Sequence, residues 1–243
     1  MPFSVADDAA DAVIAKVRAA LEPLADRTRA EQMQAYMKDV APFLGISTPS
    51  RRASVRPILR SLDVPSEEHL GALVRKLWGL DEREYHYAAC DLLAHFNKHT
   101  SHDFLVGHVE FLVTTKSWWD TVDCLGSAII TPLVARNQEL VATMWVWLRD
   151  ANIWLRRAAI QHQRGLKQHT DVPRLVAMCE ERAADKEFFV AKAVGWALRD
   201  LAHLDATAAT EFLARHDGVE FAAPLSAVAR REAVRGLNAV RAP

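Results

Sequence analysis

Four seven-residue segments of this chain align with one another at nearly constant spacing, and this repeat limits the fold more than any other feature. They begin at Glu84, Trp118, Ile153 and Phe188, so the intervals are 34, 35 and 35 residues. The second position is always aromatic, and the seventh always holds a small or apolar residue. A period of this length is typical of helix pairs that stack into a solenoid, in which each pair buries its apolar face on its neighbours.

One residue departs sharply from the repeat. Asp123 occupies the sixth position, where the other three segments have Ala89, Ala158 and Ala193. A carboxylate in such a column is either exposed on the inner face of the superhelix or costly to bury. Trp119 lies four residues earlier and therefore shares a helical face with Asp123. This pairing is compatible with a binding wall that carries a charge, but the spacing alone favours a core indole beside a surface acid.

Two further departures lie on equivalent helices. Trp196 stands where the earlier segments have leucine, glycine and glutamine, and Arg157 and Lys192 share a column that is apolar in the first two segments. Inner helices of solenoids line a concave binding surface. We therefore expect the lone acid, the extra indole and the two cations to belong to one site.

Helical patterning extends over nearly the whole chain, and alternating strand patterns are absent. The predicted helices span residues 8–25, 29–40, 49–62, 66–79, 82–98, 102–114, 117–135, 137–149, 152–167, 171–184, 186–203, 205–215 and 224–240. Connections between them are short, so consecutive helices should be antiparallel neighbours. The sequence thus predicts an all-α fold, a C-shaped α-solenoid of antiparallel HEAT-like helix pairs with a concave groove, as a single domain over residues 1–243.

Local signals place a helix start next to Asp123. Ser117 followed three residues later by Asp120 resembles a capping box, which would make Trp118 the first helical residue. Asp120 would then form a surface ion pair with Lys116. A Schiff-base role for Lys116 is the less favoured alternative.

Composition limits the class of protein. The formal net charge is −1 over 243 residues, which excludes a globally basic nucleic-acid binder but allows a local basic face. Three cysteines without a CxxC pair favour reduced thiols in a cytosol, so we expect a cytoplasmic protein. No apolar run reaches the roughly 18 residues of a membrane span, and we expect a monomer without membrane contact. The histidines lack ligand spacing, so neither a metal site nor a cofactor is expected.

Several stretches, taken in order, resemble the alkylpurine DNA glycosylases built from HEAT-like repeats, the AlkD-like DNA alkylation repair family. The resemblance covers roughly residues 30–241. It rests on Tyr36-Met37-Lys38, Phe43-Leu44-Gly45-Ile46, Thr48-Pro49, Arg51-Arg52, Leu77-Trp78, Glu82-Arg83-Glu84, Thr115 to Asp123, Asn152 to Leu155, Arg157 to Ile160, Lys186 to Phe189, Lys192-Ala193, Gly195-Trp196 and Leu198-Arg199.

The resemblance implies a positively charged concave groove that binds duplex DNA. It also implies hydrolysis of the N-glycosidic bond of cationic N3- and N7-alkylated purines, without flipping the base into a pocket. The family's functional aspartate matches Asp123, and its two tryptophans match Trp119 and Trp196. Its groove arginine matches Arg157, and its groove tyrosine matches Tyr36.

Other basic residues are candidates for DNA contact on sequence grounds. Lys192 shares the column of Arg157, and Arg199 lies near it. Arg51 and Arg52 could hold a phosphate near Pro49, although a solvated face is an equal alternative. A non-catalytic solenoid that binds DNA or protein is the alternative function. Asp123 argues against it, because an acid in a phosphate-binding groove repels the DNA backbone.

Overall fold

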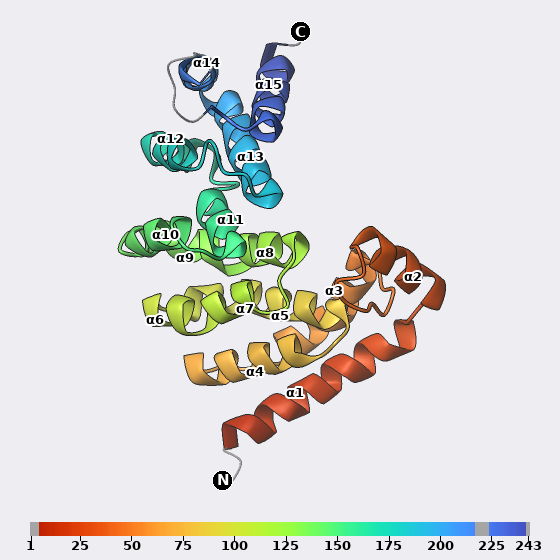
Figure 1. Ribbon diagram of the computed structural model, residues 1–243. Coiled ribbons are helices and arrows are strands. Elements are labelled where there is room, and N and C mark those ends of the chain that lie inside the picture. The colour runs from red at the N-terminus through yellow and green to blue at the C-terminus, as the bar shows by residue number, and fades with distance from the viewer. Residues whose placement is uncertain (1–4, 217–223, 242–243) are drawn as a thin grey trace. The chain divides into compact units, whose positions relative to one another are not determined.

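The computed structural model describes residues 5–216 and 224–241, and every regular element in these ranges is helical (Figure 1). This confirms the predicted all-α fold. The chain divides into two compact units, Met1–Leu133 and Val134–Pro243, which are described separately. The sequence analysis expects a single domain over residues 1–243, and this expectation stays a prediction.

The first unit is built on a long N-terminal helix. Helix α1 packs against both α3 and α4, and α4 packs against α5, which in turn contacts α8. The α-helices that lie wholly in this unit are α1 (Val5–Leu21), α2 (Arg27–Tyr36), α3 (Thr48–Arg60), α4 (Glu67–Gly79), α5 (Arg83–Phe96), α6 (His102–Phe104), α7 (Glu110–Thr114) and α8 (Trp119–Leu125), and short 3₁₀ turns occur at Glu22–Leu24 and Asn97–His99.

The second unit has its own core around α13. Helix α13 packs against α11, α12, α14 and α15, and Figure 1 shows α13 and α15 side by side. The helices are α10 (Leu140–Leu148), α11 (Ile153–Gln161), α12 (Val172–Glu181), α13 (Phe188–Leu204), α14 (Ala206–Arg215) and α15 (Ala227–Arg241), with a 3₁₀ turn at Lys167–His169. Helix α9 (Thr131–Arg136) crosses the boundary between the units in the sequence.

The α13–α15 contact depends on glycine. A Cβ atom on Gly195 would lie 2.8 Å from the Cβ of Glu232 and 2.9 Å from the Cα of Ala229. Real Cβ atoms do not approach other heavy atoms this closely, so the two helices are closer than any side chain at residue 195 would permit. The result places Glu232 directly against the helix that carries Trp196.

Two predicted helices contain an irregular turn. The predicted helix 102–114 has a π-helical turn at Leu105–Val109, and the predicted helix 117–135 has one at Gly126–Ile130. The second turn starts three residues after Asp123, and the Ser127 hydroxyl donates to the carbonyl of Cys124 at 3.1 Å. Such turns are rare and frequently occur near functional sites.

The predicted start of the Asp123 helix is off by one residue. Trp118, not Ser117, is the N-cap, and its backbone N–H donates to the Thr121 hydroxyl at 3.4 Å. The Ser117 hydroxyl instead donates to the carbonyl of Val113 at 2.6 Å, in the last turn of α7. The Ser117 hydroxyl therefore bonds to the last turn of α7 and does not cap the start of α8.

Candidate functional site

Asp123 lies in the wall of a cavity of about 550 Å³ in the first unit. Its side chain is partly exposed, whereas the alanines in the same column of the repeat are buried, with 0–2% of their surface accessible. Residues from α2, α3, α5 and α8 and from the loop before α3 complete the wall: Gln32, Met33, Tyr36, Met37, Phe43, Thr48, Arg51, Arg52, Tyr87, Asp120 and Cys124. The departure from the alanine column therefore coincides with an open cavity.

Tyr36 and Trp119 form an aromatic pair next to this cavity. Their ring centroids are 6.4 Å apart and the rings meet edge to face at 80°. Tyr36 is the last residue of α2 and is 71% exposed. Met37 is the C-cap of α2, and the next two residues, Lys38 and Asp39, have positive φ angles of 63° and 57°. They turn the chain sharply after Tyr36. An exposed aromatic ring beside a carboxylate is suited to contact a sugar or a base.

Asp120, three residues before Asp123, is buried, and its partner is not the predicted one. Its carboxylate accepts hydrogen bonds from the Arg83 guanidinium at 2.7 and 3.0 Å and from the Tyr87 hydroxyl at 2.5 Å. Burial alone would raise the pKa of Asp120, but the hydrogen bonds and charge of Arg83, with the bond from Tyr87, lower it overall. The predicted surface pair with Lys116 is therefore wrong, because Asp120 is fully committed to Arg83 and Tyr87.

Lys116 has a structural position in the first unit. Its ammonium group donates to the carbonyls of Gly79 and Leu80, at 2.9 and 2.8 Å, where α4 ends. A cation at a helix C-terminus is stabilised by the unsatisfied carbonyls there. These contacts give Lys116 no nucleophilic role and argue against the Schiff-base alternative.

Glu84 holds the loop that leads into α3. Its carboxylate is fully buried and accepts hydrogen bonds from the backbone N–H groups of Leu44, Gly45 and Ile46, at 2.9, 2.9 and 3.0 Å. The neighbouring Asp26 N–H donates to the carbonyl of Leu44, so the same loop fixes the start of α2. Glu84 belongs to a stretch that carries the family resemblance, but only the fold reveals what it positions.

Arg51 and Arg52 occupy different environments although they are adjacent. Arg51 is 3% exposed, and its guanidinium bonds to Asp91 at 3.1 and 3.2 Å and lies 5.0 Å from the Tyr87 ring centroid. Arg52 contacts the same carboxylate at 3.3 Å, but its side chain is 57% exposed. Only Arg52 presents its charge to solvent, and Arg51 is part of a buried ion pair.

Cys124 also reaches the cavity. A hydrogen bond with the Cys90 thiol and the positive charges of Arg51 and Arg52 lower the pKa of Cys124, although burial opposes this. Burial raises the pKa of the Cys90 thiol. The two cysteines share one column of the repeat, and only Cys124 lines the cavity.

In the second unit, Trp196 is surrounded by positive charge. Four cations lie within 6 Å of its ring centroid: Arg164 at 4.8 Å, Arg157 at 5.0 Å, Lys192 at 5.4 Å and Arg199 at 5.8 Å. Each is in range for a cation–π contact. The structure thus brings Arg157, Lys192, Arg199 and Trp196 together in the second unit.

Arg157 differs from its neighbours in exposure. It is 1% exposed, and its guanidinium donates to the carbonyl of Phe189 at 2.7 Å. Arg164 is exposed, and 35% of the Arg199 side chain is accessible. Arg157 therefore packs beneath the Trp196 ring, and the exposed charge of this cluster comes from its neighbours.

Glu232 organises the cations around Trp196, and no local sequence signal pointed to it. Its side chain is 2% exposed and contacts Lys192 at 2.7 Å, Arg235 at 3.1 Å and Arg199 at 3.6 Å. The hydrogen bond from Lys192 is the main cause that lowers the pKa of Glu232, and burial opposes it. Lys192 is 40 residues away in the sequence, so only the packing of α15 on α13 reveals the contact.

In residues 5–216 and 224–241, no group of three or more His, Cys, Asp and Glu side chains is arranged to hold a metal ion. Over the same ranges, none of the helices combines the length and apolar character needed to cross a bilayer.

Comparisons with known proteins identify the family of the chain. Residues 17–237 match the profile of a family described as DNA alkylation repair enzyme. A solved structure described as a predicted DNA alkylation repair enzyme from Enterococcus faecalis is 29% identical, with a TM-score of 0.78 over 87% of this chain and 95% of that one.

A second solved structure supports the fold alone. The smu.31 protein from Streptococcus mutans UA159 is 17% identical, with a TM-score of 0.59 over 84% of this chain and 97% of that one. No curated protein matches the sequence. Because the family profile matches most of its length, the chain belongs to the DNA alkylation repair enzyme family.

Proposed function

We propose that the protein is a monofunctional DNA glycosylase that excises cationic N3- and N7-alkylated purines from duplex DNA. Membership of the DNA alkylation repair family gives the general role. The observation that carries the specific reaction is the position of Asp123, partly exposed in a cavity wall beside the Trp119–Tyr36 pair.

The chemistry of the substrate determines what the protein must supply. Alkylation at N3 or N7 makes the purine cationic, so the base leaves as a neutral molecule without protonation. The bond between C1′ and the base nitrogen breaks, its electron pair goes to the nitrogen, and the deoxyribose becomes an oxocarbenium-like cation. A fixed negative charge beside the sugar stabilises that cation, and a positioned water completes hydrolysis at C1′.

Asp123 fits this role and Asp120 does not. Asp120 is buried and accepts hydrogen bonds from Arg83 and Tyr87, so its charge is already compensated inside the protein. Asp123 faces the cavity, where a deoxyribose could approach its carboxylate and where its side chain could orient a water molecule. Trp119 and Tyr36 offer aromatic surfaces, to which a cationic sugar or base is attracted.

The second unit supplies a separate element of the proposal. The cations next to Trp196 that reach solvent are Arg164, which is exposed, and Lys192 and Arg199, which are partly exposed, with Arg157 packed beneath them. We assign this cluster to the DNA backbone, with Arg52 of the first unit as a further phosphate contact. A local basic cluster reconciles DNA binding with a net charge of −1.

The test is excision of a single N7-methylguanine from duplex DNA under single-turnover conditions, read out by cleavage of the abasic site with hot alkali. Asp123→Asn keeps the side-chain shape but removes the charge, and should lower the excision rate on the order of 10²-fold or more. DNA binding should be unchanged or tighter, because a charge that repels phosphate is lost. Excision by the wild type should continue in EDTA, since water is the only co-reactant.

The matched control is Asp103→Asn, which removes a carboxylate whose side chain is 95% exposed and which is not among the residues of the cavity. Its excision rate should equal that of the wild type. Excision by Asp123→Asn at the wild-type rate would show that Asp123 is not catalytic. If the wild type binds DNA but excises nothing, a non-catalytic DNA-binding solenoid becomes the better assignment.

A further inference from the structure

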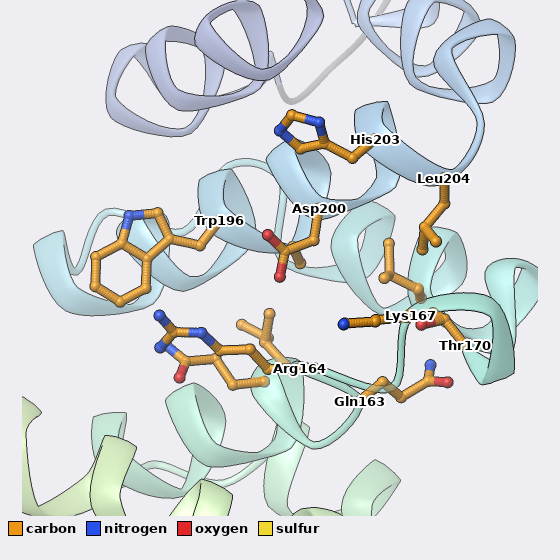
Figure 2. Close-up of a pocket in the computed structure, with 13 residues that line it drawn as sticks. Gln163, Arg164, Lys167, Thr170, Trp196, Asp200, His203 and Leu204 are labelled. Atoms are coloured by element: carbon orange, nitrogen blue, oxygen red, sulfur yellow. The ribbon is translucent and has the colours of Figure 1, made fainter. Parts of the chain in front are cut away.

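A second cavity, of about 410 Å³, lies entirely within the second unit beside Trp196 (Figure 2). Its volume falls in the range of small-molecule sites, about 300–1,000 Å³. Most of the wall is apolar and comes from α11, α12 and α13. The aliphatic and aromatic residues of this wall are Ile160, Leu175, Trp196, Ala197 and Leu204.

One carboxylate in this wall lacks a partner. Asp200, on α13 one turn after Trp196, is partly buried, and makes no hydrogen bond or ion pair with any other residue in the described part of the chain. Burial raises the pKa of Asp200, although the positive charges of Arg164 and Arg199 oppose the shift. A half-buried acceptor that faces a cavity is the group that a ligand with N–H donors would satisfy.

Hydrogen-bond donors line the same cavity. Arg164 and Lys167 belong to the turn that follows α11, where Gly165 and Lys167 have positive φ angles of 85° and 51°. A left-handed conformation is unusual for lysine, and such strain is concentrated at functional sites. Figure 2 shows the Lys167 ammonium and the Asp200 carboxylate directed into the cavity, between Trp196 and Leu204.

We propose that this cavity binds a free purine base of the guanine type. The N1–H and exocyclic N2–H groups of guanine form adjacent donors that a carboxylate such as Asp200 accepts together, and the neighbouring O6 accepts from Lys167 or Arg164. The flat ring system fits against the apolar wall that ends at Trp196. Adenine presents an unprotonated N1 on the equivalent edge, which a carboxylate repels.

This assignment extends the proposed function. It rests on that function only for the identity of the natural ligand. Excision of N7-methylguanine releases a neutral base that keeps N1–H, N2–H and O6. The cavity would hold that product after it has left the DNA. No bond forms or breaks in this step, and the only changes are the hydrogen bonds and the burial of the ring.

Equilibrium dialysis of the full-length, DNA-free protein against 7-methylguanine tests the proposal directly. Binding should be saturable, and adenine should bind about tenfold more weakly or worse, because it loses the paired donors. Asp200→Asn should weaken 7-methylguanine binding about tenfold or more, because one acceptor oxygen becomes a donor that opposes the base. Glu211→Gln, an exposed carboxylate of the same unit that does not line the cavity, should bind like the wild type.

Separate readouts distinguish this proposal from the proposed excision activity. Asp200→Asn should keep the wild-type melting temperature and the wild-type single-turnover excision rate, whereas Asp123→Asn should keep base binding and lose excision. Absence of saturable binding by the wild type, or equal affinity of Asp200→Asn and wild type, overturns the base-binding assignment. Base binding by a wild type that excises nothing would leave the cavity assigned and the glycosylase proposal rejected.

Discussion

The carboxylate of Asp120 on α8 and the guanidinium of Arg83 on α5 form a doubly hydrogen-bonded ion pair in the interior of the first unit. Both are nearly inaccessible, with side-chain exposures of 6% and 1%. Arg83 also donates to the carbonyl of Lys116 at 2.7 Å and to the Thr121 hydroxyl at 3.0 Å. The pair therefore fixes the first turn of the helix that carries Trp119 and Asp123.

Removing Arg83 should destabilise the protein strongly. Arg83→Met leaves the Asp120 carboxylate buried without its counter-ion, which typically costs about 3–5 kcal/mol. Denaturant unfolding of the purified protein measures the change. Arg27→Met is the matched control, because the Arg27 side chain is 93% exposed and its ion pair should add little. Equal stability of the two variants would show that the buried pair contributes nothing to the fold.

The helices and Asp123 could be predicted from the sequence, but the Arg83–Asp120 pair could not. Apolar periodicity is a local signal, so the helical segments can be recognised from the sequence. The alanine column recurs at regular spacing, so Asp123 is recognised as its exception. Arg83 and Asp120 are 37 residues apart, and the short-range reading paired Asp120 with Lys116, which is four residues away. The contacts of Glu84 and Glu232 could not be predicted for the same reason, because their partners are about 40 residues distant in the sequence.

Cys124 should be the most reactive thiol in the folded protein. It is partly exposed, and its lowered pKa increases the thiolate fraction at neutral pH. Cys90 and Cys179 are buried, and burial raises the pKa of each. Brief treatment with iodoacetamide followed by peptide mass spectrometry should show labelling of Cys124 first. Preferential labelling of Cys179 would contradict this order.

Acid should destabilise the protein through two buried histidines. Burial is the main cause that lowers the pKa of His86 and of His162, from 6.5 to about 4 in each case. Between pH 4 and 6.5 the unfolded chain therefore binds more protons than the folded one, so stability falls as pH falls through this window. The loss is up to about 3 kcal/mol for each histidine.

Unfolding in denaturant at several pH values measures this effect. His162→Gln cannot take up the proton, so its stability should depend less on pH between 4 and 6.5 than that of the wild type. His203, which is exposed, provides the control as His203→Gln, and this variant should keep the wild-type pH dependence. An identical pH dependence for all three proteins would rule out His162 as a source of acid sensitivity.

Exposed and buried arginines next to Trp196 should affect DNA binding differently. Arg199→Ala removes a partly exposed charge and should reduce the dependence of log affinity on log salt by about one unit. Arg157→Ala removes a side chain that is 1% exposed and packs on Trp196, so it should weaken binding with little change in the salt slope. Fluorescence anisotropy with duplex DNA over a salt series separates the two. A slope reduced by one unit in Arg157→Ala would mean that this residue contacts phosphate.

Glu232 should control both stability and the arrangement of cations around Trp196. Its carboxylate is the common partner of Lys192, Arg199 and Arg235, and it lies at the close contact between α15 and α13. Glu232→Gln keeps the side-chain size but leaves three cations without their counter-charge. The free energy of unfolding should fall, but by less than the about 3–5 kcal/mol typical of a fully buried pair, because the cations left behind are partly exposed to solvent.

The pH dependence of Glu232 gives an independent check. Its pKa is lowered in the folded protein, so its contribution to stability is present above the ordinary glutamate pKa of 4.5 and is lost as pH falls through the lower folded value. Glu232→Gln should therefore differ most from the wild type near neutral pH, and the difference should shrink below pH 4.5. Glu211→Gln, an exposed carboxylate of the same unit, should show no such convergence. A difference between Glu232→Gln and wild type that stays constant down to strong acid would mean that packing, and not the carboxylate charge, is what this residue contributes.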